Sequence, residues 1–94
     1  MSENYLTLIR HCLRYSPKTG RLHWQRHMHR GGKVYLLRCP SGVYRIQLGH
    51  ERFLAHDVTW FLVRGTWPTA PIWHRNGNRW DNRIENLALA TAAP

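Results

Sequence analysis

Hydrophobic residues recur at helical spacing in two stretches of this 94-residue chain. Over residues 3–15 the apolar positions form one stripe, made of Tyr5, Leu6, Leu8, Ile9, Cys12 and Leu13. This pattern predicts an amphipathic helix that begins after a Ser2 cap and ends before Pro17. A second helix is predicted over residues 56–65, with an apolar side made of Val58, Phe61 and Leu62. Gly65 then supplies the C-terminal stop.

Alternating residues predict short strands around these helices. The predicted strands cover 21–25, 33–39, two segments within 42–56, 72–74 and 87–90. A two-residue turn at Gly49-His50 joins the pair within 42–56. Alternation in the first strand of this pair gives one face of Val43, Arg45 and Gln47 and an opposite face of Tyr44, Ile46 and Leu48.

The segments between these elements carry turn and loop residues. We predict a turn at 16–20, a basic loop at 26–32 and an irregular segment with two prolines at 66–71. A polar loop follows at 75–86 and ends in a one-turn helix at 82–86, with Asp81 and Asn82 capping its backbone amides. Ile84, Leu87 and Leu89 are expected in the core. The predicted fold class is α+β, a small domain with an N-terminal helix and short antiparallel strands.

Length and composition point to one small domain, 1–94. The 43% apolar content, with five Trp, is enough for a core and argues against disorder. No run approaches the roughly 18 apolar residues of a transmembrane helix, and the polar start is not a signal peptide. We therefore expect a cytoplasmic protein with no membrane partner.

Cys12 and Cys39 are the only cysteines. Without a CxxC spacing or an export signal, they are interpreted as reduced, structural thiols. The alternative is a zinc site that includes His23, His27 and His29. That spacing lacks the paired ligands that zinc sites normally show.

The charge of the chain indicates a polyanionic partner. Fourteen basic residues against five acidic ones give a net charge of +9, and twelve of the fourteen are Arg. Arg binds phosphates and guanine edges through two hydrogen bonds at once and stacks on bases. Nucleic acid is therefore the favoured partner. The alternatives are a charge that only keeps the chain soluble, or an interface for an acidic protein.

Two stretches carry a resemblance to a known family. The sequence "AHDVTWFLVRGTWP…IWHRNGN..DNRIENLALAT" resembles phage and homing-type endonucleases of the HNH family, and "LRYSPKTGRLHW" resembles the leader of such phage proteins. The resemblance implies a leader helix and strands over 1–50 and an HNH-like region over 51–94. It also implies a phage-derived protein. The final helix of the ββα-metal unit is expected to be missing.

His74 is the candidate general base. It stands at the end of a predicted strand and opens a polar loop, where a neutral imidazole could activate water for phosphodiester hydrolysis. By resemblance, Asn86 hydrogen-bonds across the loop and orients His74, so Asn86 should be buried and bonded. His56 matches the family's His before its helix and is expected to pack there. Asp57 stands where the family usually has Arg.

The metal site departs from the family pattern. In the family, a carboxylate just before the base and an Asn or His several residues beyond "LAT" hold the metal ion. Here the first position is Trp73, whose indole offers no lone pair to a hard cation. The second would fall near position 95. Asp81 and Glu85 stand in the wrong part of the loop, so we predict no metal ligands. Trp73 is expected to fill the cation's space and cover the core.

These observations predict a catalytically inactive HNH-like protein that binds DNA and acts as a regulator or inhibitor. The candidate DNA-binding residues are Arg45, Arg52, Arg75, Arg79, Trp80 and Arg83. No cofactor is expected. One alternative is an active nicking endonuclease with Mg²⁺ in a rebuilt metal site. Another is a counter-defence module that binds a host or phage protein.

Overall fold

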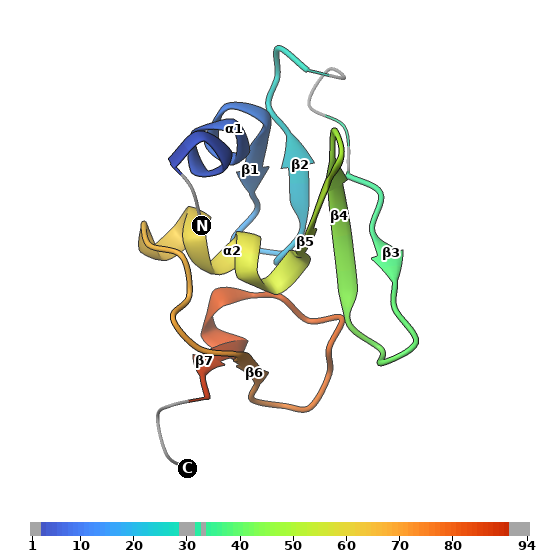
Figure 1. Ribbon diagram of the computed structural model, residues 1–94. Helices are drawn as coiled ribbons and strands as arrows, with labels where there is room; N and C mark the ends of the chain where they lie inside the picture. The colour runs from blue at the N-terminus through green and yellow to red at the C-terminus, as the bar shows by residue number, and fades with distance from the viewer. Residues whose placement is uncertain (1–2, 29–31, 33, 91–94) are drawn as a thin grey trace.

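Over the residues that the structure describes, the chain combines two short α-helices and a 3-10 helix with short antiparallel strands, which confirms the predicted α+β class (Figure 1). The computed structural model describes residues 3–28, 32 and 34–90. Its elements are α1 (Glu3–Cys12), β1 (Leu13–Tyr15), β2 (Leu22–Trp24), β3 (Leu37–Arg38), β4 (Tyr44–Leu48), β5 (Glu51–Leu54), α2 (Ala55–Arg64), β6 (Ile72–His74), the 3-10 helix η2 (Ile84–Asn86) and β7 (Leu87–Leu89). Among the described residues, no helix is long and apolar enough to cross a membrane.

The described strands form three small antiparallel sheets, in the orders β1-β2, β3-β4-β5 and β6-β7. In the β4–β5 hairpin, Leu48 pairs with Glu51, which confirms the predicted two-residue turn at Gly49-His50. Ile46 and Leu48 are buried and Gln47 is exposed, as their alternation predicts. Each of these sheets is small, so its stability depends on what covers its apolar face.

Helix α2 supplies that cover and lies at the centre of the fold (Figure 1). It contacts β1, β4, β5 and η2, and so links the N-terminal strands to the β6–β7 end of the molecule. Its face of Ala55, Val58 and Phe61 joins Ile9 and Ile46 in the main hydrophobic core. The helix ends at the predicted Gly65, which adopts a left-handed conformation (φ 82°) and donates its N–H to the Phe61 carbonyl.

The first helix ends three residues earlier than predicted. Residues Leu13–Tyr15 leave the helix and pair as β1 with β2, Leu13 opposite Trp24 and Tyr15 opposite Leu22. Gln25 explains the early end, because its backbone N–H binds the Cys12 carbonyl at 2.8 Å and its side-chain amide donates to the Arg10 and Leu13 carbonyls. These bonds satisfy carbonyls that a longer helix would use internally. The predicted Ser2 cap lies outside the described residues.

The strand predicted at 33–39 is reduced to the two residues of β3. Leu37 and Arg38 pair with β4, whereas the N–H of Val34 donates to the Leu22 carbonyl of β2 at 3.3 Å. The segment before β3 therefore turns toward another sheet, and the ladder to β4 stops at Leu37.

The leader contacts the C-terminal segment directly. The Ile84 N–H donates to the Tyr15 hydroxyl at 2.8 Å. Gly20 lies so close to the opposite backbone that an added Cβ would stand 2.4 Å from the Arg83 nitrogen. The two ends of "YSPKTG" thus hold the chain at residues 82–84, which places the loop 75–86 against the leader.

The two cysteines are free thiols; Cys12 is buried and Cys39 half-buried. Burial raises the pKa of Cys12 and makes its thiol less reactive. His29, a member of the alternative zinc site, lies outside the described residues. The rings of His11 and His27 lie 4.7 Å apart, and His23 has interactions of its own.

Candidate functional site

The β6–β7 pair carries the candidate site at the end of the molecule away from α1 (Figure 1). Its register places Trp73 opposite Ala88 and His74 opposite Leu87. Because strand side chains alternate, Ile72 and His74 share the core side, where Ile72 is buried and His74 half-buried. Trp73 points to the other side.

The imidazole of His74 is held from two directions. Its Nε2 lies 2.7 Å from Oδ1 of Asn82, and its ring meets the His56 ring edge to face at 5.2 Å. An amide oxygen only accepts, so in this arrangement Nε2 is the donor, and in the neutral ring the lone pair is on Nδ1. Asn82 was predicted to cap a backbone amide; that prediction is wrong, because its side-chain oxygen faces His74. Asp81 does accept the Arg83 N–H, at 3.3 Å.

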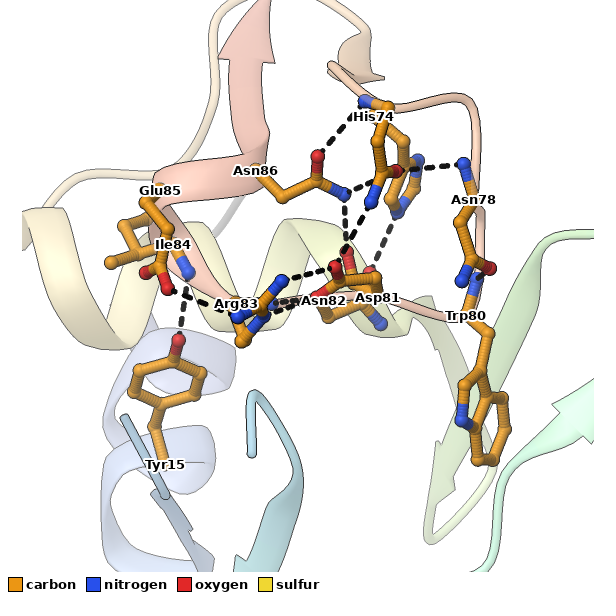
Figure 2. A network of polar contacts seen from close by, with 11 residues as sticks. Tyr15, His74, Asn78, Trp80, Asp81, Asn82, Arg83, Ile84, Glu85 and Asn86 are labelled. Atoms are coloured by element: carbon orange, nitrogen blue, oxygen red, sulfur yellow. Dashed lines mark hydrogen bonds and ion pairs between the residues drawn. The ribbon is translucent and has the colours of Figure 1, made fainter. Parts of the chain in front are cut away.

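Asn86 fastens the loop that follows His74 (Figure 2). It is buried and bonded as predicted: its Oδ1 accepts the Asn76 N–H, and its Nδ2 donates to Asn76 Oδ1 and to the Asp81 carbonyl. Its own carbonyl accepts the Arg75 N–H at 2.8 Å. These bonds shape residues 75–81, whereas the ring contact belongs to Asn82. That Asn86 orients His74 therefore stays a prediction, and any such effect would pass through the loop.

Buried His56 contacts His74, and half-buried Asp57 follows it in α2. Burial lowers the pKa of His56 to about 4, and His74 adds to the effect. Burial raises the pKa of Asp57 to about 6. The 3.7 Å between His56 Nε2 and Asp57 Oδ1 is an ion pair only when His56 is protonated, and burial keeps it neutral at pH 7. His56 is a packing residue at the start of α2, as expected from the sequence.

Trp73 does not cover the core. Its side chain is 46% exposed, which corrects the expectation that it is largely buried. By alternation it lies on the side of β6 opposite Ile72 and His74, and about half of its surface stays open to solvent there. The indole stands at the position where the family resemblance places a metal-binding carboxylate.

The residues around His74 do not fit the metal ion that the family uses. Indole cannot ligate a hard cation. Both carboxylate oxygens of Asp81 are bound by Arg83, which together with Asn76 lowers the pKa of Asp81 to about 2. Burial of Asp57 disfavours its charged form. Within the described part of the chain, no group of three His, Cys, Asp or Glu side chains is placed to hold a metal ion.

The candidate DNA-binding residues fall into two groups. Arg45 and Arg52 share one face of the β4–β5 hairpin, since Arg52 pairs with Gln47, which lies on the Arg45 side. Arg52 is exposed, but Arg45 is half-buried, and its Nε has no hydrogen-bond partner among the described residues. The second group lies in the loop after His74 and consists of Arg75, Arg79, Trp80 and Arg83.

Within the loop group, the side chains differ in availability. Arg75 is exposed. Arg79 donates to the Ser41 carbonyl and so ties the loop to the turn before β4. Arg83 gives Nε and Nη2 to Asp81, both at 2.9 Å, which leaves it less free for phosphate. Trp80 projects away from the His74 cluster (Figure 2), is 48% exposed and packs edge-on against Tyr44 at 4.6 Å.

Sequence reasoning missed three positions that build this site. Asn82 binds the His74 ring, Tyr15 binds the Ile84 amide, and Gly20 admits the backbone of 82–83. Tyr15 and Gly20 both lie in the segment "LRYSPKTGRLHW" that resembles the family's leader, and this resemblance was the sequence feature that marked them. It gave no indication of what they contact.

Comparison with known proteins agrees with this architecture. Residues 53–93 match the HNH endonuclease family. The fold is similar to that of the HNH homing endonuclease I-HmuI, whose structure concerns DNA binding and cleavage: the TM-score is 0.61 and the sequence identity 21%, over 81% of this chain and 44% of that chain. The present chain thus spans less than half of that enzyme. No curated protein matches. Residues 53–93 are thus similar to the HNH endonuclease family, and the fold is similar to that of an HNH homing endonuclease.

Proposed function

We propose that this protein binds DNA through its arginine-bearing surface and does not cleave it by the metal-assisted reaction of HNH endonucleases. The observation that carries the proposal is Trp73, a half-exposed indole on β6 beside the held His74. A one-metal reaction relies on the cation to stabilise the leaving oxygen, which contributes several kcal/mol. Without a carboxylate at this position to hold the cation, His74 could activate water, but the leaving oxygen would lack its stabilising charge. Such a protein would still bind DNA without cutting it, and could act as a regulator or inhibitor.

The charge distribution supports DNA as the ligand. The net charge of +9 favours a polyanion. Arg52 and Arg75 are exposed and, among the described residues, pair with no acidic side chain. The similarity to I-HmuI, a DNA-binding enzyme by its description, points the same way.

A plasmid nicking assay tests the lack of cleavage. Supercoiled plasmid is incubated with the parent, Trp73→Asp or His74→Ala in Mg²⁺ or Mn²⁺. We expect the parent to give no more nicked circles than His74→Ala. Robust nicking by the parent that His74→Ala abolishes would overturn the proposal. Nicking gained only by Trp73→Asp would show directly that the missing carboxylate silences the site.

A salt titration tests DNA binding. If about 4–6 arginines contact phosphates, the logarithm of the affinity should fall against the logarithm of salt concentration with a slope of about −4 to −5. Arg75→Gln should reduce the slope by about one. Arg10→Gln is the matched control, because it removes the same charge from α1, away from β6–β7 (Figure 1). No binding at low salt, or no slope, would favour a protein partner instead.

The second candidate is a nicking endonuclease, and one observation favours it. His74 is half-buried, Asn82 Oδ1 contacts its Nε2, and in the neutral ring Nδ1 offers the lone pair that a general base needs. The nicking assay decides between this activity and DNA binding alone.

A further inference from the structure

A cavity of about 830 Å³ lies between the leader and the loop; His74 does not line it, but Asn82, which contacts the His74 ring, does. Its walls are the β1–β2 turn at 19–22, the segment 34–36, and loop residues including Asn78 and Trp80. This volume falls within the roughly 300–1,000 Å³ of small-ligand pockets.

Two aromatic side chains line the cavity with unusually large exposed areas. The side chain of Tyr35 is 94% exposed and that of Trp80 is 48% exposed. Tyr44 supports Trp80 from one side at 4.6 Å. Exposed aromatic rings that are held from behind are the platforms on which single-stranded nucleic acid stacks its bases.

The charges at the cavity favour an anionic ligand. The Arg21 guanidinium lies over the Trp80 ring, 5.6 Å from its centroid, and among the described residues pairs with no acidic group. Asp81, the acid that lines the cavity, is neutralised by Arg83. A free guanidinium next to an aromatic face suits a planar ring that carries a phosphate.

The backbones of two of the three walls, the β1–β2 turn and the loop, are fixed against each other before any ligand arrives. The backbone of Gly20 packs directly on residues 82–83, so the turn and the loop cannot slide apart without losing that contact. The Trp80 N–H donates to Asn78 Oδ1 at 3.0 Å, and Arg79 anchors the loop to Ser41. A preformed site loses less entropy when a ligand binds.

We propose that this cavity takes one unpaired nucleotide of a DNA strand, with the base stacked on Trp80 and the adjoining phosphate bound by Arg21. The gap between Arg21 and Trp80 is too narrow for a base, so Arg21 leaves the ring and follows the phosphate. The proposal rests on the proposed DNA binding and adds a preference for DNA with an unpaired base over a continuous duplex.

Fluorescence anisotropy with two labelled duplexes of equal length tests the preference. One duplex is fully paired and the other carries a single unpaired nucleotide. We expect the parent to bind the second about 5- to 100-fold more tightly, the range of one base–aromatic stack. Trp80→Leu and Arg21→Gln should remove most of this ratio, and Tyr35→Ala should reduce it. Trp73→Leu is the matched control, because Trp73 has a similar exposed fraction of 46% and does not line the cavity.

Each outcome decides separately on the cavity and on DNA binding. Equal affinity of the parent for both duplexes would refute the cavity proposal and leave DNA binding standing. A ratio that Trp73→Leu lowers as much as Trp80→Leu would also refute it. If Trp80→Leu fails to fold, Tyr35→Ala decides, since a side chain 94% exposed contributes little to stability. If the parent binds neither duplex, both proposals fail.

Discussion

His74 Nε2 and Asn82 Oδ1 lie 2.7 Å apart and close one loop of the site. The contact joins the end of β6 to the residue two positions before η2, and Asn82 is only 4% exposed. A buried amide oxygen next to a ring nitrogen selects one tautomer of the imidazole, so the geometry of the loop determines which nitrogen keeps the lone pair.

Replacing Asn82 should remove the preference of the His74 ring for one tautomer. Asn82→Ala leaves the Nε2–H without its partner, so we expect the free energy of unfolding to fall by about 1–3 kcal/mol. Nitrogen NMR should show the His74 ring of the parent protonated at Nε2 and the variant ring as a mixture of tautomers. Asn78→Ala, at an exposed Asn of the same loop, is the control and should leave the ring unchanged. An unchanged ring in Asn82→Ala would contradict the assignment.

Asn86 should contribute more to stability than Asn82. Asn86→Ala removes three hydrogen bonds and leaves the Asn76 N–H and the Asp81 carbonyl without the Asn86 side chain as a partner. A loss of about 2–4 kcal/mol in urea unfolding is expected. Hydrogen exchange supplies an internal control: the Asn76 amide should lose protection, whereas the neighbouring Arg75 amide, bound to the Asn86 backbone carbonyl, should keep more of its own. Equal loss at both amides would mean that the whole loop has unfolded.

Asp57 should destabilise the fold at neutral pH. Its pKa is about 6 in the folded protein against an ordinary 3.8, so the folded state binds more protons between these values and stability falls as pH rises through them. His56 acts oppositely: its pKa of about 4 lies below the ordinary 6.5, and stability rises with pH over about 4–6.5. The two slopes largely cancel in the parent, which hides both.

Asp57→Asn removes one of these opposing slopes. We expect it to stabilise the protein by about 1–3 kcal/mol above pH 6 and by almost nothing below pH 4. Urea unfolding at pH values from 4 to 7.5 measures the difference. Glu85→Gln, which removes the same charge at an exposed position, is the control for the loss of a negative charge. A gain that is the same at pH 4 and 7.5 would show that titration is not its cause.

Local patterns predicted the elements whose signals are local. The Gly65 stop, the Gly49-His50 turn and the short strands β6 and β7 were all found from neighbouring residues. The end of α1 was misplaced because Gln25, twelve residues beyond Leu13, binds its carbonyls. Asn82 was misread for a related reason: a capping role and a contact with His74 are equally compatible with an Asn before a short helix.

Trp73 shows the same limit in the core. Alternation gives the side of β6 on which the indole lies, but burial depends on whether another segment covers that side. In the described structure the indole is 46% exposed. The chemical inference at this position does not depend on burial, since indole lacks a lone pair for a cation wherever it points.

Because Trp73 is half-exposed, its replacement should be well tolerated. We expect Trp73→Asp to lower the free energy of unfolding by about 1 kcal/mol or less, mainly through strand propensity. Ile72→Ala, at the preceding residue of the same strand, which is 8% exposed, should cost about 2–4 kcal/mol. Urea denaturation of both variants at one pH gives the comparison. A Trp73→Asp loss as large as that of Ile72→Ala would mean that the indole is covered in solution.

Gly20 and Gly49 should respond very differently to the same substitution. Both have positive φ, 72° and 61°, so alanine at either position costs about 1–2 kcal/mol in backbone strain. At Gly49 nothing lies within 4 Å of an added Cβ, and that strain is the whole cost. At Gly20 the Cβ would stand 2.4 Å from the Arg83 nitrogen and 2.7 Å from the Asn82 carbonyl carbon, and backbone cannot rotate away as a side chain can.

Gly20→Ala must therefore push the leader away from residues 82–84. We expect a loss of about 2–5 kcal/mol, and a weaker bond between the Ile84 N–H and the Tyr15 hydroxyl. Chemical denaturation measures the loss, and hydrogen exchange at the Ile84 amide reports the contact. The same displacement should move Asn82 and disturb the His74 ring, which Gly49→Ala should leave unaffected. If the two alanine variants lose equal stability, or if the Ile84 amide stays protected in Gly20→Ala, then the leader does not hold the His74 loop through Gly20.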